Sequence, residues 1–197
     1  MGHLGIDATP AQVTLYLIGG PPRTGKTTLA KRILRERGIP WASTDAVRDT
    51  VSPVVPGLVE AGRLGEPPEP EADLLVPFIV RFALDMAYVA GGAYVVEGIG
   101  FLPRDVHRFE RHGDDVRAVF VGFSDVTLAS IDLHAPHSWQ ATATDDERTR
   151  LVPWILDSSE RYRADAAAHR QPYVDLSPDF EAGHDAALER LFADREA

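Results

Sequence analysis

The chain contains no cysteine. Disulfide bonds, thiolate metal sites and catalytic thiols are therefore excluded, and nothing in the composition points to an oxidising compartment. With 197 residues the chain has the length of one ordinary domain, which can bury a sizeable core without cross-links. We expect a single domain over residues 1–197.

The sequence also lacks a long apolar run and an excess of basic charge. No stretch approaches the roughly 18 to 20 apolar residues of a membrane helix, and the opening MGHLGIDATPAQ has neither the basic nor the apolar block of a signal peptide. Thirty acidic residues against twenty basic ones give a formal charge of −10, which repels a phosphate-rich polymer. We expect a cytoplasmic protein, monomer or homodimer, that binds a small phosphorylated ligand rather than a membrane or nucleic acid.

Lysine is nearly absent, which makes each lysine informative. The basic residues are arginine except for Lys26 and Lys31. Lys26 lies in the stretch GGPPRTGKTT, directly after the apolar run VTLYLIG. A position that keeps lysine where the chain otherwise uses arginine is typical of a site that needs a compact point charge.

The glycine-rich stretch fits the pattern G-x-x-x-x-G-K-[ST] from Gly20 to Thr27, with an expected strand before it and an expected helix after it. Glycines let the backbone wrap closely around an anion, and the helix amino terminus adds partial positive charge. Lys26 would neutralise the β and γ phosphates of ATP, and the Thr27 hydroxyl would hold Mg²⁺. The expected nucleotide-binding residues are Gly20, Arg23, Thr24, Gly25, Lys26, Thr27 and Thr28.

A simpler interpretation of this stretch is a turn between a strand and a helix. Such a turn would explain Gly20 and the two prolines that follow it, but it would leave the run GKT without a reason. Arg23 stays open between two roles, because a loop arginine either touches phosphate or is solvated.

Short apolar segments alternate with helical patterns along the chain. The expected strands span residues 13–19, 39–43, 93–98, 116–123 and 171–176, and the expected helices span 26–37, 44–51, 72–90, 103–113, 124–135, 151–170 and 179–195. The strands are nearly all apolar, as strands buried on both faces of a parallel sheet are. The alternation predicts an α/β fold with a five-stranded parallel sheet and ligands at the carboxyl ends of its strands.

Two segments lack a core pattern. GRLGEPPEPEAD is rich in proline and acidic residues, so we interpret residues 53–72 as a mobile substrate arm. PHSWQATATDDERTR is polar without apolar periodicity, which is typical of a small lid over residues 136–150. The neighbouring HAPH invites a metal site, but His134 and His137 have no evident third ligand, so surface histidines are the simpler interpretation.

Four stretches carry a resemblance to one known group of enzymes: GGPPRTGKTT, STDAVRD after the second strand, VVEG at the end of the third, and ERTRLVPWILDSSERYR. In these stretches the chain resembles the small P-loop kinases, which include adenylate, shikimate and gluconate kinases and the kinase domain of polynucleotide kinase. QPYVDLS also resembles ATPase-like members of this group and relatives of 2-phosphoglycerate kinase. The resemblance covers nearly the whole chain and implies a three-layer α/β/α P-loop NTPase fold that uses ATP and Mg²⁺ to phosphorylate a hydroxyl group.

In such kinases an Asp at the end of the second strand, with an Arg three residues later, faces the acceptor hydroxyl, and Asp45 and Arg48 match this pattern. A carboxylate can deprotonate an alcohol as it attacks the γ-phosphorus, and a cation one turn later can hold an acidic substrate or the transferring group. The spacing places both on one helix face. The alternative is that Thr44 or Asp45 caps the helix and Arg48 is solvated.

Glu97 ends an otherwise apolar strand beside the expected phosphate site. Together with Thr27 it can hold Mg²⁺, or it can contact the acceptor, or it can simply pair with a cation at the strand end. The following GIGFLPR resembles a substrate-lining loop, which makes Phe101 and Arg104 further substrate candidates.

Phosphoryl transfer spreads negative charge over the moving group, and a closing lid usually brings arginines to it. Arg148 and Arg150 lie where the lid should end, and Arg161 and Arg163 lie on the helix behind it. We assign a catalytic role to Arg148. Each of the four can also be a solvated helical charge.

The sequence favours an ATP-dependent small-molecule kinase with Asp45 as the base, and sugars, sugar acids, nucleosides and antibiotic-like metabolites are all open as acceptors. A nucleotide-dependent switch without an acceptor is the first alternative; a GTPase would carry N-K-x-D, which is absent because lysine occurs only at positions 26 and 31. A 5′-hydroxyl nucleic-acid kinase is the second. It agrees with Asp45 and Arg48 but conflicts with the acidic charge and the lack of a basic, aromatic-rich tract.

Overall fold

A computed structural model of the chain describes residues 13–113, 115–134 and 144–193. Within these residues five strands form one sheet in the order β2-β3-β1-β4-β5, and every neighbouring pair is parallel. The strands are β1 (Thr14–Gly19), β2 (Trp41–Ser43), β3 (Ala93–Gly98), β4 (Asp115–Gly122) and β5 (Tyr173–Asp175). The predicted five-stranded parallel sheet is therefore confirmed.

Side chains along each strand alternate between the two faces of the sheet, because successive residues point to opposite sides. Leu15 and Leu17 of β1 pack into one apolar cluster, whereas Ile18 packs into the other with Val95 of β3. Both faces of the sheet are thus buried, which explains why the strands are almost continuously apolar. Glu97 has the same parity as Val95, so it faces the side that holds Ile18.

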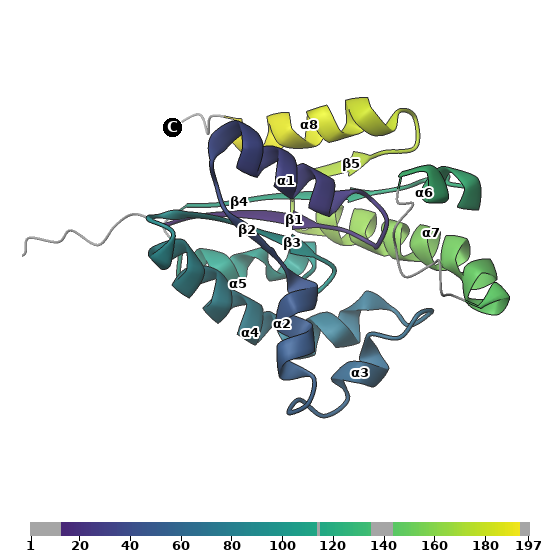
Figure 1. Ribbon diagram of the computed structural model, residues 1–197, viewed down its shortest axis with the longest axis horizontal. Coiled ribbons are helices and arrows are strands. Elements are labelled where there is room, and N and C mark those ends of the chain that lie inside the picture. Colours follow the sequence, from purple (N-terminus) through teal and green to yellow (C-terminus); the bar gives the residue numbers. More distant parts are fainter. Residues whose placement is uncertain (1–12, 114, 135–143, 194–197) are drawn as a thin grey trace, which may run out of the picture.

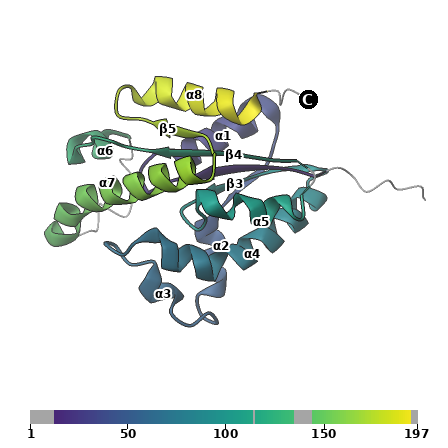
Figure 2. The same ribbon diagram turned by 180° about the vertical axis from the view of Figure 1, so that it is seen from behind.

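Helices cover both faces of the sheet and complete three layers (Figures 1 and 2). α1 (Lys26–Arg37) and α8 (Phe180–Phe192) lie on one face, and α4 (Pro68–Val89) and α5 (Val106–Glu110) lie on the other. α7 (Asp145–Ala168) packs along β4 and contributes Tyr162 to the cluster beneath α4. The α/β/α arrangement that the sequence predicted is therefore confirmed.

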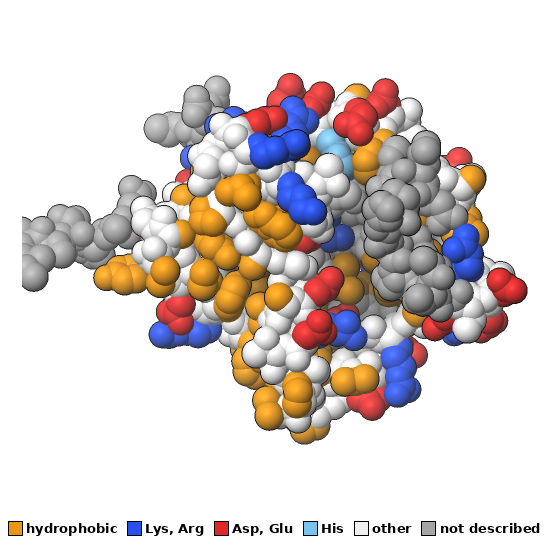
Figure 3. All heavy atoms as spheres, in the orientation of Figure 1, with side chains coloured by type: hydrophobic (Ala, Val, Ile, Leu, Met, Phe, Trp, Pro, Cys, Tyr) orange, Lys and Arg blue, Asp and Glu red, His pale blue; other side chains and the backbone are white. Residues whose placement is uncertain are grey.

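The shorter elements gather around the carboxyl ends of the strands. They are α2 (Thr44–Val51), α3 (Leu58–Ala61), the 3₁₀ turn η1 (Pro103–Asp105) and α6 (Leu128–His134). Because all strands run in parallel, the loops that follow them meet at a single edge of the sheet. The surface is hollowed near this edge, and charged side chains of both signs border the hollow (Figure 3).

The start of α4 differs from the prediction. The helix begins at Pro68 rather than near residue 72, because a proline at the first helical position lacks an N–H that would have no partner there. Ala72 is fully buried, so the segment that we expected in a mobile arm forms the first turns of a core helix. No helix in the described ranges has the length and apolar character of a membrane span.

The cap of α2 and the starts of α7 and α6 also differ from the prediction. α2 is capped by Ser43, whose hydroxyl accepts from the Asp45 N–H, rather than by Thr44 or Asp45. α7 begins at Asp145 instead of residue 151, since Thr144 and Glu147 form a capping box. α6 begins at Leu128 instead of residue 124, because the side chains of Asp175 at the end of β5 and of Ser177 after it accept from the Ser124 N–H. Residues 136–143 of the expected lid, with His137, lie outside the described residues.

Candidate active site

The glycine loop, residues 20–25, joins β1 to α1 and depends on two glycines. Gly20 has a φ of 145° and Gly25 a φ of 71°, conformations that residues with a side chain rarely adopt. A Cβ atom at Gly20 would lie 2.1 Å from the Val121 carbonyl oxygen, and one at Gly25 would lie 2.4 Å from Cε1 of His184. Both positions therefore require glycine, for backbone conformation and for close packing against β4 and α8.

Lys26 lies at the end of this loop and is only 6% exposed. Its Nζ donates to the Pro21 carbonyl at 2.6 Å and lies 3.4 Å from the Thr24 hydroxyl. Burial lowers the pKa of Lys26 to about 8, although Glu97 and Asp45 oppose this shift. A buried ammonium group that is bound to neutral oxygens favours an anionic ligand, because such a ligand restores the stabilisation that burial removes.

Thr27 and Glu97 meet across the gap between α1 and β3. The Thr27 hydroxyl donates to Glu97 Oε1 at 2.9 Å, and the Glu97 side chain is 2% exposed. Burial raises the pKa of Glu97, while Lys26 and the Thr27 hydroxyl lower it. One hydroxyl and one carboxylate beside a phosphate site are the few protein oxygens that Mg²⁺ prefers, so these residues fit a magnesium ion that takes its other ligands from phosphate and water.

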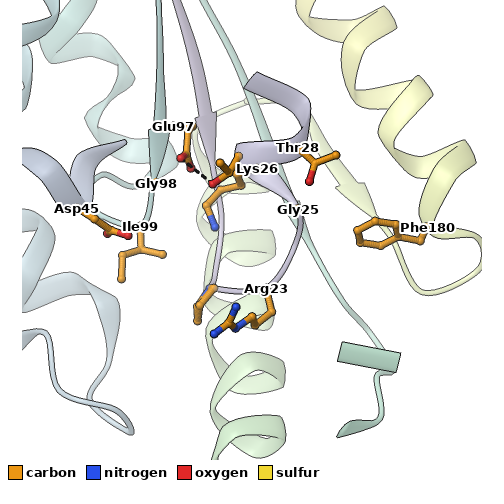
Figure 4. Close-up of a pocket in the computed structure, with 11 residues that line it drawn as sticks. Arg23, Gly25, Lys26, Thr28, Asp45, Glu97, Gly98, Ile99 and Phe180 are labelled. Atoms are coloured by element: carbon orange, nitrogen blue, oxygen red, sulfur yellow. Dashed lines mark hydrogen bonds between the residues drawn. The ribbon is translucent and has the colours of Figure 1, made fainter. Parts of the chain in front are cut away.

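A cavity of about 290 Å³ opens in front of these groups. The glycine loop, Lys26, Thr28 and Glu97 line it, and Asp45 from the first turn of α2 faces it from the other side (Figure 4). Asp45 is exposed and acts on the pKa values of both Lys26 and Glu97, so it lies within electrostatic reach of the loop. The cavity thus brings together a buried ammonium group and a carboxylate that solvent can reach.

No protein-family model matches the chain, and no curated protein matches it in sequence. Solved structures do match in fold. A gluconokinase from Sinorhizobium meliloti 1021 shares 15% identity at a TM-score of 0.54 over 92% of each chain. A shikimate kinase from Bacteroides thetaiotaomicron shares 18% identity at a TM-score of 0.53, covering 91% of this chain and 97% of that one.

A sugar kinase from Janibacter sp. HTCC2649 shares 19% identity at a TM-score of 0.53, with 91% of this chain and 94% of that one covered. All three matches cover nine tenths of the chain or more. The chain has the fold of the P-loop kinases. Its glycine loop is accordingly called the P-loop below.

Two residues of α8 that shape the P-loop were missed by the sequence analysis. His184 is 2% exposed, and its Nε2 lies 3.0 Å from the Thr24 carbonyl oxygen. Because a carbonyl can only accept, Nε2 carries the ring proton. The ring of Phe180 lies against His184, with centroids 4.2 Å apart, and lines the cavity opposite Asp45 (Figure 4).

The sequence gives little indication of this contact, because His184 and Thr24 are separated by 160 residues.

A second cavity of about 220 Å³ lies beyond Phe180, between the loops that follow β4 and β5. Arg23 and Phe180 line both cavities. The two cavities therefore adjoin at Arg23 and Phe180.

Three of the predicted substrate residues lie elsewhere. Arg48 points to α4, where its Nε binds Glu71 at 3.0 Å, and Arg104 binds Asp73 at 2.7 Å. Phe101 is fully buried among the aromatic rings of the core. Among the predicted substrate residues, the structure brings Asp45 and Glu97 to the cavity and places these three outside its lining.

Some of the predicted P-loop side chains line the cavity, and others do not. Thr28 and Arg23 line the cavity, and Arg23 has a φ of 70°, which is uncommon for a residue with a side chain. Thr24 is fully buried, and its hydroxyl donates to the Pro21 carbonyl at 3.0 Å, so it shapes the loop rather than the cavity surface.

The arginines of α7 are engaged on its surface. Arg150 binds Asp146, Arg161 binds Asp157 and Glu69, and Arg163 binds Glu160. Arg148 lies in the first turns of α7 and not in the lining of the cavity. Across the residues that the structure describes, no group of three or more His, Asp or Glu side chains forms a metal site by itself.

Proposed function

We propose that the protein is a cytoplasmic ATP-dependent kinase that transfers the γ-phosphoryl group to a hydroxyl group of a small molecule. The observation that carries the proposal is the convergence of Lys26, the Thr27–Glu97 pair and Asp45 on one cavity at the carboxyl edge of the sheet. The fold shared with solved kinases supports it.

The P-loop would bind the phosphates of ATP. Nucleotide binding would draw Lys26 Nζ away from the Pro21 carbonyl and toward phosphate oxygens, because an anion stabilises the buried ammonium better than a neutral carbonyl does. The space beyond Phe180 would take the nucleoside part, with Arg23 between the two cavities. His184 would keep the P-loop in place through the Thr24 carbonyl.

Thr27 and Glu97 would hold Mg²⁺ through their side-chain oxygens. When bound, the ion would neutralise charge on the phosphates. Burial raises the pKa of Glu97, but Lys26 and the Thr27 hydroxyl keep the ionised form accessible, which a metal ligand requires.

Asp45 would accept the proton of the attacking hydroxyl. The acceptor oxygen forms a bond to the γ-phosphorus as the bond from that phosphorus to the bridging oxygen breaks, which releases ADP and leaves the proton on the Asp45 carboxylate. Asp45 suits this role because it lies on the first turn of α2, opposite the P-loop, and is exposed to an incoming substrate. Residues 53–72, with α2, would form the acceptor side of the site.

The experiment that tests the proposal is a screen of hydroxylated metabolites for ATP-dependent gain of one phosphoryl group, read by mass spectrometry. Lys26→Ala should abolish nucleotide binding or transfer. Lys31→Ala is the matched control, since Lys31 is the other lysine and lies exposed on α1. Slow ATP hydrolysis without any phosphorylated acceptor would contradict the proposal and favour a nucleotide-dependent switch.

A further inference from the structure

The acceptor side of the cavity, formed by α2, residues 53–72 and the start of α4, has its positive charges already balanced. Arg48 is the cation closest in sequence to Asp45, and its Nε binds Glu71 Oε1 at 3.0 Å. Glu71 is 3% exposed, so the pair is shielded on the carboxylate side. Buried charges attract each other more strongly than exposed ones, so Arg48 is held where it lies.

The backbone also fixes the Arg48 guanidinium group. Nη2 lies 3.5 Å from the Gly62 carbonyl oxygen, and a Cβ atom at Gly62 would lie 2.7 Å from Nη2. Arg48 therefore links α2 to the arm and to α4, and it is absent from the lining of the cavity. The Arg48 guanidinium group therefore stabilises the packing of α2 against the arm and α4, and it does not lie inside the cavity.

The other arginines near the acceptor side are also paired. Arg104 binds Asp73 at 2.7 Å, and Arg63 lies 3.8 Å from Glu60. The segments outside the described residues contain no lysine and a single arginine, Arg195, close to the end of the sequence. Neither the arm nor the loop after β3 thus offers an acceptor an arginine without an acidic partner.

Negative charge on the acceptor side is less well balanced. Asp45 lines the cavity, and Glu66 lines a small adjoining pocket between the arm and α7. Glu71 and Arg63 line that pocket too, but each is paired, with Arg48 and Glu60 respectively. Lys26 is directed to the P-loop, where a polyphosphate would take up its charge. Arg23 also lines the cavity, but from the P-loop, so an anionic acceptor would approach the Asp45 carboxylate without a compensating cation on the acceptor side.

We infer that the acceptor is a non-anionic alcohol, either an uncharged polyol or an alcohol that bears an amine, and that the Arg48–Glu71 pair is the element that excludes carboxylate-bearing and phosphate-bearing acceptors. The inference rests on the proposed kinase function and specifies its substrate class. Arg48 affects acceptor specificity because Glu71 neutralises its positive charge. It does not contact the acceptor.

The test measures kcat/KM for acceptor pairs that share a hydroxylated skeleton and differ in one acidic group, such as sorbitol with gluconate or a nucleoside with its monophosphate. These pairs are embedded in a library of uncharged, cationic and anionic alcohols. The wild-type protein should phosphorylate non-anionic members at least tenfold better than their anionic counterparts. A preference for anionic members would overturn the inference while leaving the kinase function standing.

Glu71→Gln sharpens this test because it keeps the shape of the side chain and frees the charge of Arg48. The variant should raise the relative kcat/KM for anionic acceptors about tenfold. Asp85→Asn is the matched control, since Asp85 lies on the same helix but pairs with Arg81 on the exposed face. It should leave the ratio unchanged.

The double variant Arg48→Gln with Glu71→Gln removes both charges and should return the acceptor ratio to its wild-type value. An unchanged ratio in a folded Glu71→Gln protein would overturn the role given to this pair. The wild-type comparison does not depend on either variant. If no library member is phosphorylated while Lys26-dependent ATP hydrolysis persists, the kinase proposal and the acceptor class both fail together.

Discussion

The P-loop and the acceptor side face each other across one cavity, but they are built in different ways. The P-loop is a short structure, in which two glycines, a lysine and a turn lie within residues 20–27. The acceptor side is assembled from α2, the arm and α4, which are joined by the Arg48–Glu71 pair and by a contact to the Gly62 carbonyl. The first is encoded mainly by adjacent residues, with His184 of α8 as a distant support, and the second by contacts between separate elements.

If the proposed function holds, this difference separates the nucleotide side, which the fold shares, from the acceptor side, which is particular to this chain. Backbone groups and one ammonium group suit any nucleoside triphosphate, so the P-loop carries little information about the acceptor. Ion pairs between helices set the charge that an acceptor meets, and these pairs vary with sequence. Variants that affect the P-loop and spare the acceptor side, or the reverse, therefore test directly whether the two sides act separately.

The largest expected effect comes from Asp45→Asn, which keeps the shape of the side chain and removes the proton acceptor. We expect kcat for transfer to fall about 1000-fold, because general-base catalysis contributes roughly 10²–10⁴-fold, while the Kd for ATP with Mg²⁺ stays unchanged. Stopped-flow transfer rates and calorimetric titration measure the two quantities. Equal transfer rates in both proteins would remove Asp45 from the base position.

Gly25→Ala should have the next largest effect, on the P-loop alone. The new Cβ would lie 2.4 Å from His184, at a φ of 71°, so the loop must move. We expect ATP affinity to fall about 100-fold, or about 3 kcal/mol. Gly38→Ala is the control: Gly38 has a φ of 70° but no atom within 4 Å of the new Cβ, so it should cost about 1 kcal/mol of stability and no affinity.

The contrast between the two sides also explains how much the sequence could predict. The strands, α1 and the P-loop follow from local patterns: apolar runs, the glycine spacing, and a lysine in a chain that favours arginine. The acidic, proline-rich segment misled the interpretation of the arm, because its composition is that of a loop. Whether Ala72 and Glu71 become buried depends on α2 and the sheet, which lie elsewhere in the sequence.

The direction of individual side chains was the second feature that the sequence could not predict. Arg48 is three residues from Asp45, as the predicted helix face requires, yet its guanidinium group turns to Glu71 on another helix. Phe101 follows β3 as a substrate-lining residue would, but it packs with Phe109 and Phe120 in the core. No spacing rule could indicate His184, because its partner Thr24 lies near the other end of the chain.

Glu71→Ala should destabilise the acceptor side and spare the P-loop. Removing one member of a buried pair leaves the other charge without a partner, and because Arg48 is 28% exposed we expect a loss of about 2 kcal/mol in the free energy of unfolding. Asp85→Ala breaks an exposed pair and should cost no more than about 0.5 kcal/mol. Urea unfolding measures the loss of stability in each variant. Equal losses would show that the Arg48–Glu71 pair stabilises the protein no more than an exposed pair does.

The smallest expected effect is a pH dependence confined to the P-loop. Burial lowers the pKa of Lys26 from 10.5 to about 8, and a bound polyphosphate favours the charged form, so nucleotide binding should take up a proton between about pH 8 and pH 10.5. ATP affinity should then fall as the pH rises above 8, by at most about tenfold per pH unit. Titration calorimetry at pH 8.5 in two buffers of different ionisation enthalpy measures the proton uptake directly. Lys31→Ala should retain that uptake, since Lys31 is exposed on α1, and zero uptake in both proteins would place the ammonium group of Lys26 outside the phosphate site.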